Sequence, residues 1–144
     1  MYEKICTFFG DADTFSPDLT DKINAALVCL IENGYNTFYS GHFNSFDKMC
    51  EKTVADLKSK YPHIRLYGIV PELKPNESSY FDEIIEPYLK SSLHTQERAK
   101  CNYIIEKSDF VLCHVEKYFG FSWVMKKHAE KIGREVINLA EQYF

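Results

Sequence analysis

Residues 35–73 combine a strand, a glycine-bearing turn, a helix and a second strand in one continuous stretch. Residues 37–39 favour β structure and run into Ser40 and Gly41, after which apolar residues recur at helical spacing until Pro62. Residues 64–70 are almost continuously apolar, as in strands that are buried on both faces. This order predicts a βαβ unit. Because such crossovers join parallel strands, we expect a mainly parallel sheet with helices on both faces.

The rest of the chain repeats this alternation. A helix that begins at Ser16 and Pro17 and closes at Gly34 follows a first strand at residues 4–9. Downstream we expect a short helix at 80–86, a helix at 93–106, a strand at 109–115, a helix at 121–132 and a strand at 135–139. Five strands alternating with helices predict a Rossmann-like, doubly wound α/β fold with a mainly parallel five-stranded sheet. We expect residues 1–144 to form one such domain, because no linker or repeat divides them.

Composition and charge exclude several classes of function. A hydrophobic content of 45% is enough for one sizeable core. The formal net charge of -4 gives no basic field for a phosphate backbone, so we expect no nucleic-acid partner. No segment approaches the roughly 20 apolar residues that span a bilayer, and the N-terminal apolar run is too short for a signal peptide. We therefore expect a soluble, cytoplasmic protein with no membrane partner.

The cysteines and histidines give no sign of a metal site. The five cysteines are widely spaced without a Cys-x-x-Cys pair, which is typical of small hydrophobic residues in a reducing compartment. We interpret Cys6 and Cys113 as core residues of strands and Cys29 as lying on the apolar side of a helix. No pair among the five histidines has ligand spacing. We expect no metal and assign no cofactor.

Ligands of doubly wound folds bind at the carboxyl ends of the strands, where the strand order reverses. The loops that meet this condition span residues 10–14, 40–45 and 116–122. Gly41 permits close approach of a ligand, and free N–H groups at the start of the helix after it would attract an anion. Aromatic side chains on these loops can stack on a base: Phe43, Tyr118, Phe119 and Phe121. Three such loops at one sheet edge predict a pocket for a nucleotide-type ligand.

Several stretches of the chain resemble one family. SGHFNSFD with the helix and strand after it, and then ERAK, SDFVL and GFS, are similar to the YpsA-like branch of the SLOG superfamily. That branch is related to the cytokinin-activating phosphoribohydrolases and to the Smf/DprA Rossmann-like domains. The resemblance covers nearly the whole chain. It implies a Rossmann-like domain that binds nucleotides or nucleotide-derived small molecules, often as a homo-oligomer.

The resemblance also implies roles for individual residues. Ser40, Gly41 and Asp47 would line the pocket, and Arg98 would meet a phosphate or ribose. A glycine loop would be formed by Gly120, Phe121 and Ser122, in place of the usual Gly-Gly-Thr. With the loop residues Gly10, Asp11, His42 and Phe43, these make the candidate ligand-binding set.

Two positions depart from the family pattern. Where the hydrolases carry a catalytic glutamate this chain has Met125, whose thioether cannot act as an acid or a base. This departure favours a module that senses or sequesters its ligand without family-type hydrolysis. The first loop has Gly10 and Asp11 where relatives commonly carry a Gly-His-Arg type sequence. Asp11 would repel a phosphate or bind ribose hydroxyls.

Four other functions remain open from the sequence. An N-glycosidic hydrolase or a deoxyribosyltransferase-like enzyme could use Asp11, Asp47 or Glu116 as its catalytic carboxylate. A strand that runs into Asp11 and Asp13 also resembles phosphatases of the haloacid-dehalogenase type. Thr14 and Phe15 follow where that family has glycine and threonine, and no paired acidic motif completes a magnesium site, both of which disfavour the phosphatase. The last alternative is a non-catalytic interaction module.

Overall fold

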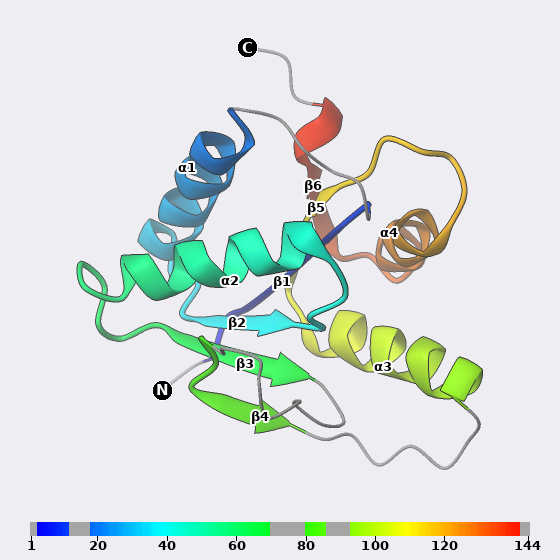
Figure 1. Cartoon of the computed structure of the whole chain (residues 1–144), viewed down its shortest axis with the longest axis horizontal. Coiled ribbons are helices and arrows are strands. Elements are labelled where there is room, and N and C mark those ends of the chain that lie inside the picture. Colours follow the sequence, from blue (N-terminus) through cyan, green and yellow to red (C-terminus); the bar gives the residue numbers. More distant parts are fainter. Residues whose placement is uncertain (1–2, 12–17, 70–79, 86–92, 142–144) are drawn as a thin grey trace.

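The computed structural model describes residues 3–11, 18–69, 80–85 and 93–141 (Figure 1). Its elements are β1 (Ile5–Gly10), α1 (Leu19–Glu32), β2 (Thr37–Ser40), α2 (Ser45–Leu57), β3 (Arg65–Ile69), β4 (Glu83–Ile85), α3 (Leu93–Lys107), β5 (Phe110–His114), α4 (Phe121–Lys131), β6 (Glu135–Asn138) and the short 3-10 helix η1 (Leu139–Glu141). The strands form one sheet in the order β4-β3-β2-β1-β5-β6, with parallel pairing throughout. The Rossmann-like α/β architecture is confirmed, but the sheet has six strands where we expected five.

The additional strand is β4, which lies where the sequence predicted a helix at residues 80–86. That prediction is wrong, because contacts distant in sequence hold these residues extended. The ring of Phe81 packs where a side chain on Gly68 of β3 would otherwise lie. The carboxylate of Asp82 accepts a hydrogen bond of 2.8 Å from a backbone N–H of β3. A three-residue edge strand carries too little local pattern to outweigh such contacts.

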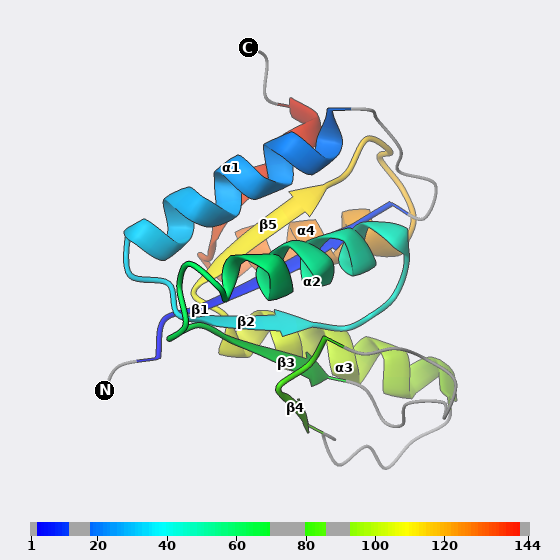
Figure 2. The same cartoon turned by 60° about the vertical axis from the view of Figure 1, so that its left-hand side comes forward.

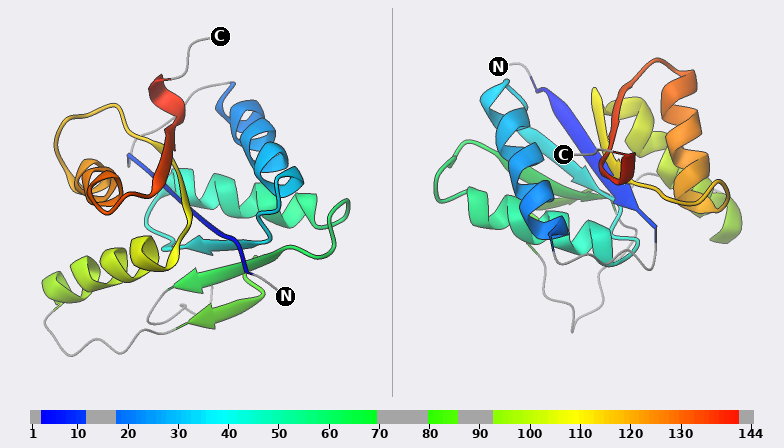
Figure 3. Two further views of the ribbon diagram at one scale, coloured as in Figure 1. Left: turned by 180° about the vertical axis from the view of Figure 1, so that it is seen from behind. Right: turned by 90° about the horizontal axis from the view of Figure 1, so that it is seen from above.

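Helices cover both faces of the sheet, with α1 and α2 on one side and α3 and α4 on the other (Figure 3). The predicted apolar stripe of α1 packs on the first face, where Leu19, Ile23 and Leu27 are buried. On the second face Phe9 of β1 packs with Met125 of α4 in a separate core cluster. The central strands are therefore buried on both sides, as their continuous apolar runs predicted.

The cysteines are free thiols, and most of them belong to the core. Cys6 and Cys113 are buried in strands as expected, and burial raises the pKa of the Cys113 thiol to about 12. The placement of Cys29 was wrong, because its side chain is exposed. It lies beside the buried residues Leu27 and Leu30 of α1 and lines a groove between this helix and the strands β5 and β6.

The strand order reverses between β1 and β5. From β1 the chain adds β2, β3 and β4 on one side, and it then returns to place β5 and β6 on the other side (Figure 2). In doubly wound sheets a crevice opens outside the carboxyl ends of the strands at such a reversal. The loops after β1, β2 and β5 therefore surround the position where a ligand is expected.

Candidate functional site

The three predicted loops meet at Gly10, the last residue of β1. The backbone carbonyl of Gly10 accepts a hydrogen bond from Asn44 Nδ2 at 2.6 Å and another from Ser122 Oγ at 2.7 Å. Asn44 belongs to the loop after β2, and Ser122 lies in the first turn of α4. The carboxyl edge of the sheet thus brings together the segments that the sequence singled out.

The start of α4 is suited to bind an anion. Gly120 precedes the helix with a φ of 90°, in the left-handed region that favours glycine. Within the described residues no side chain caps this helix end, and its first turn contains no acidic residue. N–H groups at a helix N-terminus attract negative charge, an effect of about 0.3–1 kcal/mol at an exposed site.

The start of α2, where we predicted free N–H groups, is already occupied by the protein itself. Asn44 Oδ1 accepts a hydrogen bond of 3.2 Å from the backbone N–H of Phe46. Asp47 adds a carboxyl group to the same first turn. The expectation of an open anion site at this helix end was therefore wrong, and α4 is the better candidate.

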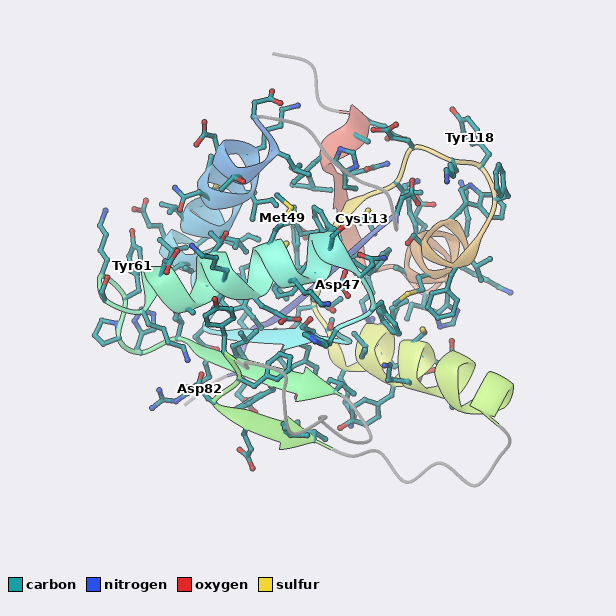
Figure 4. The ribbon with its side chains drawn as sticks, in the orientation of Figure 1. Asp47, Met49, Tyr61, Asp82, Cys113 and Tyr118 are labelled. Atoms are coloured by element: carbon teal, nitrogen blue, oxygen red, sulfur yellow. The ribbon has the colours of Figure 1, made fainter. Side chains whose placement is uncertain are left out.

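Aromatic rings form a wall between the second and third loops. Phe43 and Phe121 pack edge to face with their ring centroids 5.3 Å apart. Lys100 Nζ lies 4.2 Å from the centroid of the Phe43 ring and donates a 3.0 Å hydrogen bond to the carbonyl of Gly41. Tyr118 and Phe119 are 84% and 70% exposed, and Figure 4 shows Tyr118 at the outer rim of the third loop. The rings of Tyr118 and Phe119 are therefore available to stack on a base.

Gly41 itself leaves less room than the sequence suggested. A Cβ atom at this position would overlap the ring of Phe43, so the space beside the glycine is filled by the protein's own side chain. Gly41 is buried as well. In this structure it lets Phe43 approach the backbone, whereas we had expected it to let a ligand do so.

Beneath the second loop lies a buried hydrogen-bonded network. Ser40 Oγ donates to Glu51 Oε2 at 2.7 Å, and the two carboxylate oxygens of Glu51 lie 2.9 and 3.0 Å from His42 Nδ1. The backbone N–H of His42 donates to Ser40 Oγ at 3.2 Å. Sequence reasoning missed Glu51. The available signal was a carboxylate on the apolar face of a helix, directly after the buried Cys50.

Asp47 is fully buried at the first turn of α2, above the carboxyl end of β2 (Figure 4). Its Oδ2 accepts a 2.9 Å hydrogen bond from the backbone N–H of Phe43, whereas Oδ1 has no partner among the described residues. Burial raises the pKa of the Asp47 carboxyl to about 8, and the hydrogen bond from Phe43 only partly opposes this. The side chain is therefore mostly protonated and uncharged at neutral pH.

The other candidate carboxylates take different positions. Asp11 Oδ2 accepts a 2.8 Å hydrogen bond from the backbone N–H of Glu116, which ties the first loop to the third. The Glu116 side chain is 71% exposed. Met125, at the position of the family's catalytic glutamate, is 3% exposed and belongs to the apolar core beneath α4. A carboxylate there would be buried among apolar side chains.

Two predicted residues cannot be placed by side-chain contacts. The backbone of Arg98 lies in α3, but its side chain falls outside the described part of the chain. Asp13, which the phosphatase alternative requires, also lies outside the described residues. The role of Arg98 therefore stays a prediction.

Cavities lie on two sides of the molecule. One of about 390 Å³ adjoins the third loop, and its walls include Lys117, Lys126 and Trp123. A larger groove of about 890 Å³ runs between α1 and the strands β5 and β6 and has mainly apolar walls. We favour the carboxyl edge over this larger groove as the functional site, because convergent polar groups and an open helix N-terminus lie there.

The described residues contain no group of three or more His, Cys, Asp or Glu side chains that could hold a metal ion. They also contain no helix that is both long and apolar enough to cross a membrane.

The fold and this site define a Rossmann-like α/β protein whose loops after β1, β2 and β5 meet at the carboxyl edge of its sheet. Among solved structures, the chain is similar to the molybdenum cofactor binding protein from Rippkaea orientalis, with a TM-score of 0.63 and 17% identity over 94% of this chain and 76% of that one. It is also similar to the Moco carrier protein from Chlamydomonas reinhardtii, with a TM-score of 0.62 and 14% identity over 98% of this chain and 78% of that one. At such identities the likeness establishes the fold alone. No protein-family model matches the sequence, and no curated protein matches it.

Proposed function

We propose that this protein binds a nucleotide or nucleotide-derived small molecule at the carboxyl edge of its sheet and senses or sequesters it. The observation that carries this proposal is the uncapped N-terminus of α4, which lies beside Gly10 where the strand order reverses. A helix N-terminus at such a reversal is the usual phosphate site of doubly wound folds.

The surroundings of this helix end suit the rest of a nucleotide. The exposed rings of Tyr118, Phe119 and Phe121 offer faces for a base, and stacking on such rings is worth about 1–3 kcal/mol per base. The two solved structures named above are of proteins described as binding or carrying a molybdenum cofactor. The same fold therefore holds a small molecule in other proteins, which supports a small-molecule ligand here.

The finer parts of the proposal rest on the sequence resemblance. We assign the chain to the YpsA-like branch of the SLOG superfamily, as a single domain in the cytoplasm that can form a homo-oligomer. We propose no nucleic-acid, membrane or metal partner. The pocket is proposed to include Arg98 and the residues of the three loops.

The first prediction tests the anion site with two variants at one position. Phe121 is the first residue of α4 and is 40% exposed, so substitution should leave the core intact. Phe121→Glu places a carboxylate at the helix N-terminus, where it competes with a bound phosphate, whereas Phe121→Gln removes the same ring without adding charge. We expect adenosine and guanosine monophosphate to bind Phe121→Glu about tenfold more weakly than Phe121→Gln in calorimetric titrations.

The matching nucleosides are the control. Adenosine and guanosine lack the phosphate and should bind both Phe121 variants equally. Equal affinity of the two variants for the monophosphates would remove the start of α4 from the proposed site. Failure of the wild-type protein to bind either monophosphate would reject the proposed function as a whole.

The second prediction concerns catalysis, since an N-glycosidic hydrolase is the alternative function. The observation that favours this alternative is the exposed carboxylate of Glu116, in the third loop. Because Met125 is a buried thioether and Asp47 is enclosed, we expect no release of free base from nucleoside monophosphates above background, measured by chromatography. Robust release that is lost in Asp11→Asn or Glu116→Gln would establish an enzyme and identify its carboxylate.

A further inference from the structure

The imidazole of His42 is held by a buried carboxylate. Both carboxylate oxygens of Glu51 lie within hydrogen-bond distance of His42 Nδ1, and the Glu51 side chain is only 3% exposed. A carboxylate can only accept hydrogen bonds, so Nδ1 carries the proton in this pair. In the neutral ring Nε2 is then unprotonated and can accept a hydrogen bond.

The backbone of His42 is also fixed in an unusual conformation. Its φ of 55° lies in the left-handed region, which residues other than glycine rarely adopt. The hydroxyl of Ser40 accepts the His42 N–H, and the ring of Phe81 packs edge-on at 5.6 Å. Such a strained and over-determined residue at the ligand-binding edge of a fold is typical of a functional position.

One part of the ring remains available. Among the described residues, every hydrogen bond of the His42 ring runs through Nδ1. The side chain is 13% exposed, so it is not sealed into the core. Glu51 thus fixes one nitrogen and leaves the other to meet a ligand.

We infer that His42 is a specificity-determining residue that presents Nε2 as a hydrogen-bond acceptor, so that the site selects a nucleotide carrying an N–H or O–H donor at that position. Glu51 is the positioning residue that sets this tautomer. The inference rests on the proposed function, because it assumes a nucleotide-type ligand at the carboxyl edge. It adds to that function the requirement that the ligand carries a hydrogen-bond donor that reaches Nε2 of His42.

His42→Asn is the variant that isolates Nε2. Asparagine tolerates the left-handed conformation, and its amide nitrogen can replace Nδ1 as the donor to Glu51. The substitution therefore removes Nε2 and keeps the donor to Glu51. Wild-type protein and variant are titrated with adenosine and guanosine monophosphate under the same conditions. We expect an unchanged melting temperature and about tenfold weaker binding of the preferred nucleotide by the variant.

The nitrogen NMR spectrum of the wild-type complex tests the direction of the hydrogen bond. With the preferred nucleotide bound, Nδ1 of His42 should carry the proton and Nε2 should be unprotonated. A protonated Nε2 in the complex would show that His42 donates, and it would overturn the inference.

The 2′,3′-dideoxy forms of the same nucleotides identify the donor. If the donor is a ribose hydroxyl, the dideoxy forms lose affinity for the wild type and no further affinity for His42→Asn. If it is an N–H of the base, the dideoxy forms keep the full difference between wild type and variant. Either result supports the inference.

The role of Glu51 has its own readout. In Glu51→Gln the side-chain nitrogen can donate to Nδ1, so the nitrogen NMR spectrum of His42 should lose its single tautomer. Affinity should fall to that of His42→Asn. An unchanged spectrum would overturn the role of Glu51, and unchanged affinity in His42→Asn would overturn that of His42 while leaving the proposed function intact. If the wild type binds neither nucleotide, the proposed function fails and this inference fails with it.

Discussion

Asp47→Asn is expected to stabilise the protein at neutral pH. The folded protein holds the Asp47 carboxyl at a pKa of about 8, whereas the ordinary value is 3.8. Between these values the folded state binds more protons than the unfolded state, so the free energy of unfolding falls as the pH rises. Each pH unit in that window is worth about 1.4 kcal/mol, which limits the total loss to roughly 6 kcal/mol.

Asparagine does not titrate and therefore avoids this loss. Its side-chain oxygen can still accept the hydrogen bond from Phe43. We expect the free energy of unfolding of Asp47→Asn to exceed that of the wild type by about 2–4 kcal/mol near pH 7.5, and the difference to vanish near pH 4. Urea denaturation at both pH values measures it.

Asp56→Asn is the matched control for this experiment. Asp56 lies on the same helix, but its side chain is 68% exposed and pairs with Lys52 at 3.3 Å. Its replacement should change stability by less than about 0.5 kcal/mol at either pH. If Asp47→Asn instead destabilises the protein equally at both pH values, Asp47 is not the titrating group described above.

Gly10→Ala is expected to destabilise the fold by about 2–3 kcal/mol. A Cβ at Gly10 would lie 2.7 Å from Cγ and 2.8 Å from Cβ of Phe46, which is fully buried. Because the overlap includes the Phe46 Cβ atom, rotating the ring cannot relieve it. The start of α2 must move, and with it the Asn44 side chain that joins the first two loops.

Gly133→Ala separates this overlap from ordinary effects of replacing glycine. Gly133 has a φ of 81°, but nothing lies within 4 Å of the position that a Cβ would take. The cost there comes from the left-handed backbone alone, at about 1 kcal/mol. Chemical denaturation of both variants gives the comparison. A loss in Gly10→Ala no greater than in Gly133→Ala would mean that β1 and α2 pack less tightly than described.

Much of the fold was predictable because the signals were local. The apolar stripe of α1 and the continuous run of β5 appear within single segments of the sequence, and both are buried as that pattern implies. β4 was missed because its three residues are extended by contacts with β3. Such contacts join residues far apart in the chain, and no local periodicity reports them.

The site was predictable in outline only. The general rule for doubly wound sheets indicated which loops would meet, and there the carbonyl of Gly10 accepts hydrogen bonds from both Asn44 and Ser122. The roles of Glu51 and Lys100 were missed. Each depends on a side chain that reaches the second loop from a helix, and Lys100 comes from the opposite face of the sheet.

The most direct test of the proposed site is an amide NMR titration of the wild-type protein with its preferred nucleoside monophosphate. We expect the N–H signals of Gly120, Phe121 and Ser122 to shift most, because these groups lie at the open start of α4. Signals along α1 should stay in place. Shifts confined to Ala25, Cys29 and the other residues of the groove between α1 and β6 would contradict binding at the carboxyl edge of the sheet and would place the ligand in that groove.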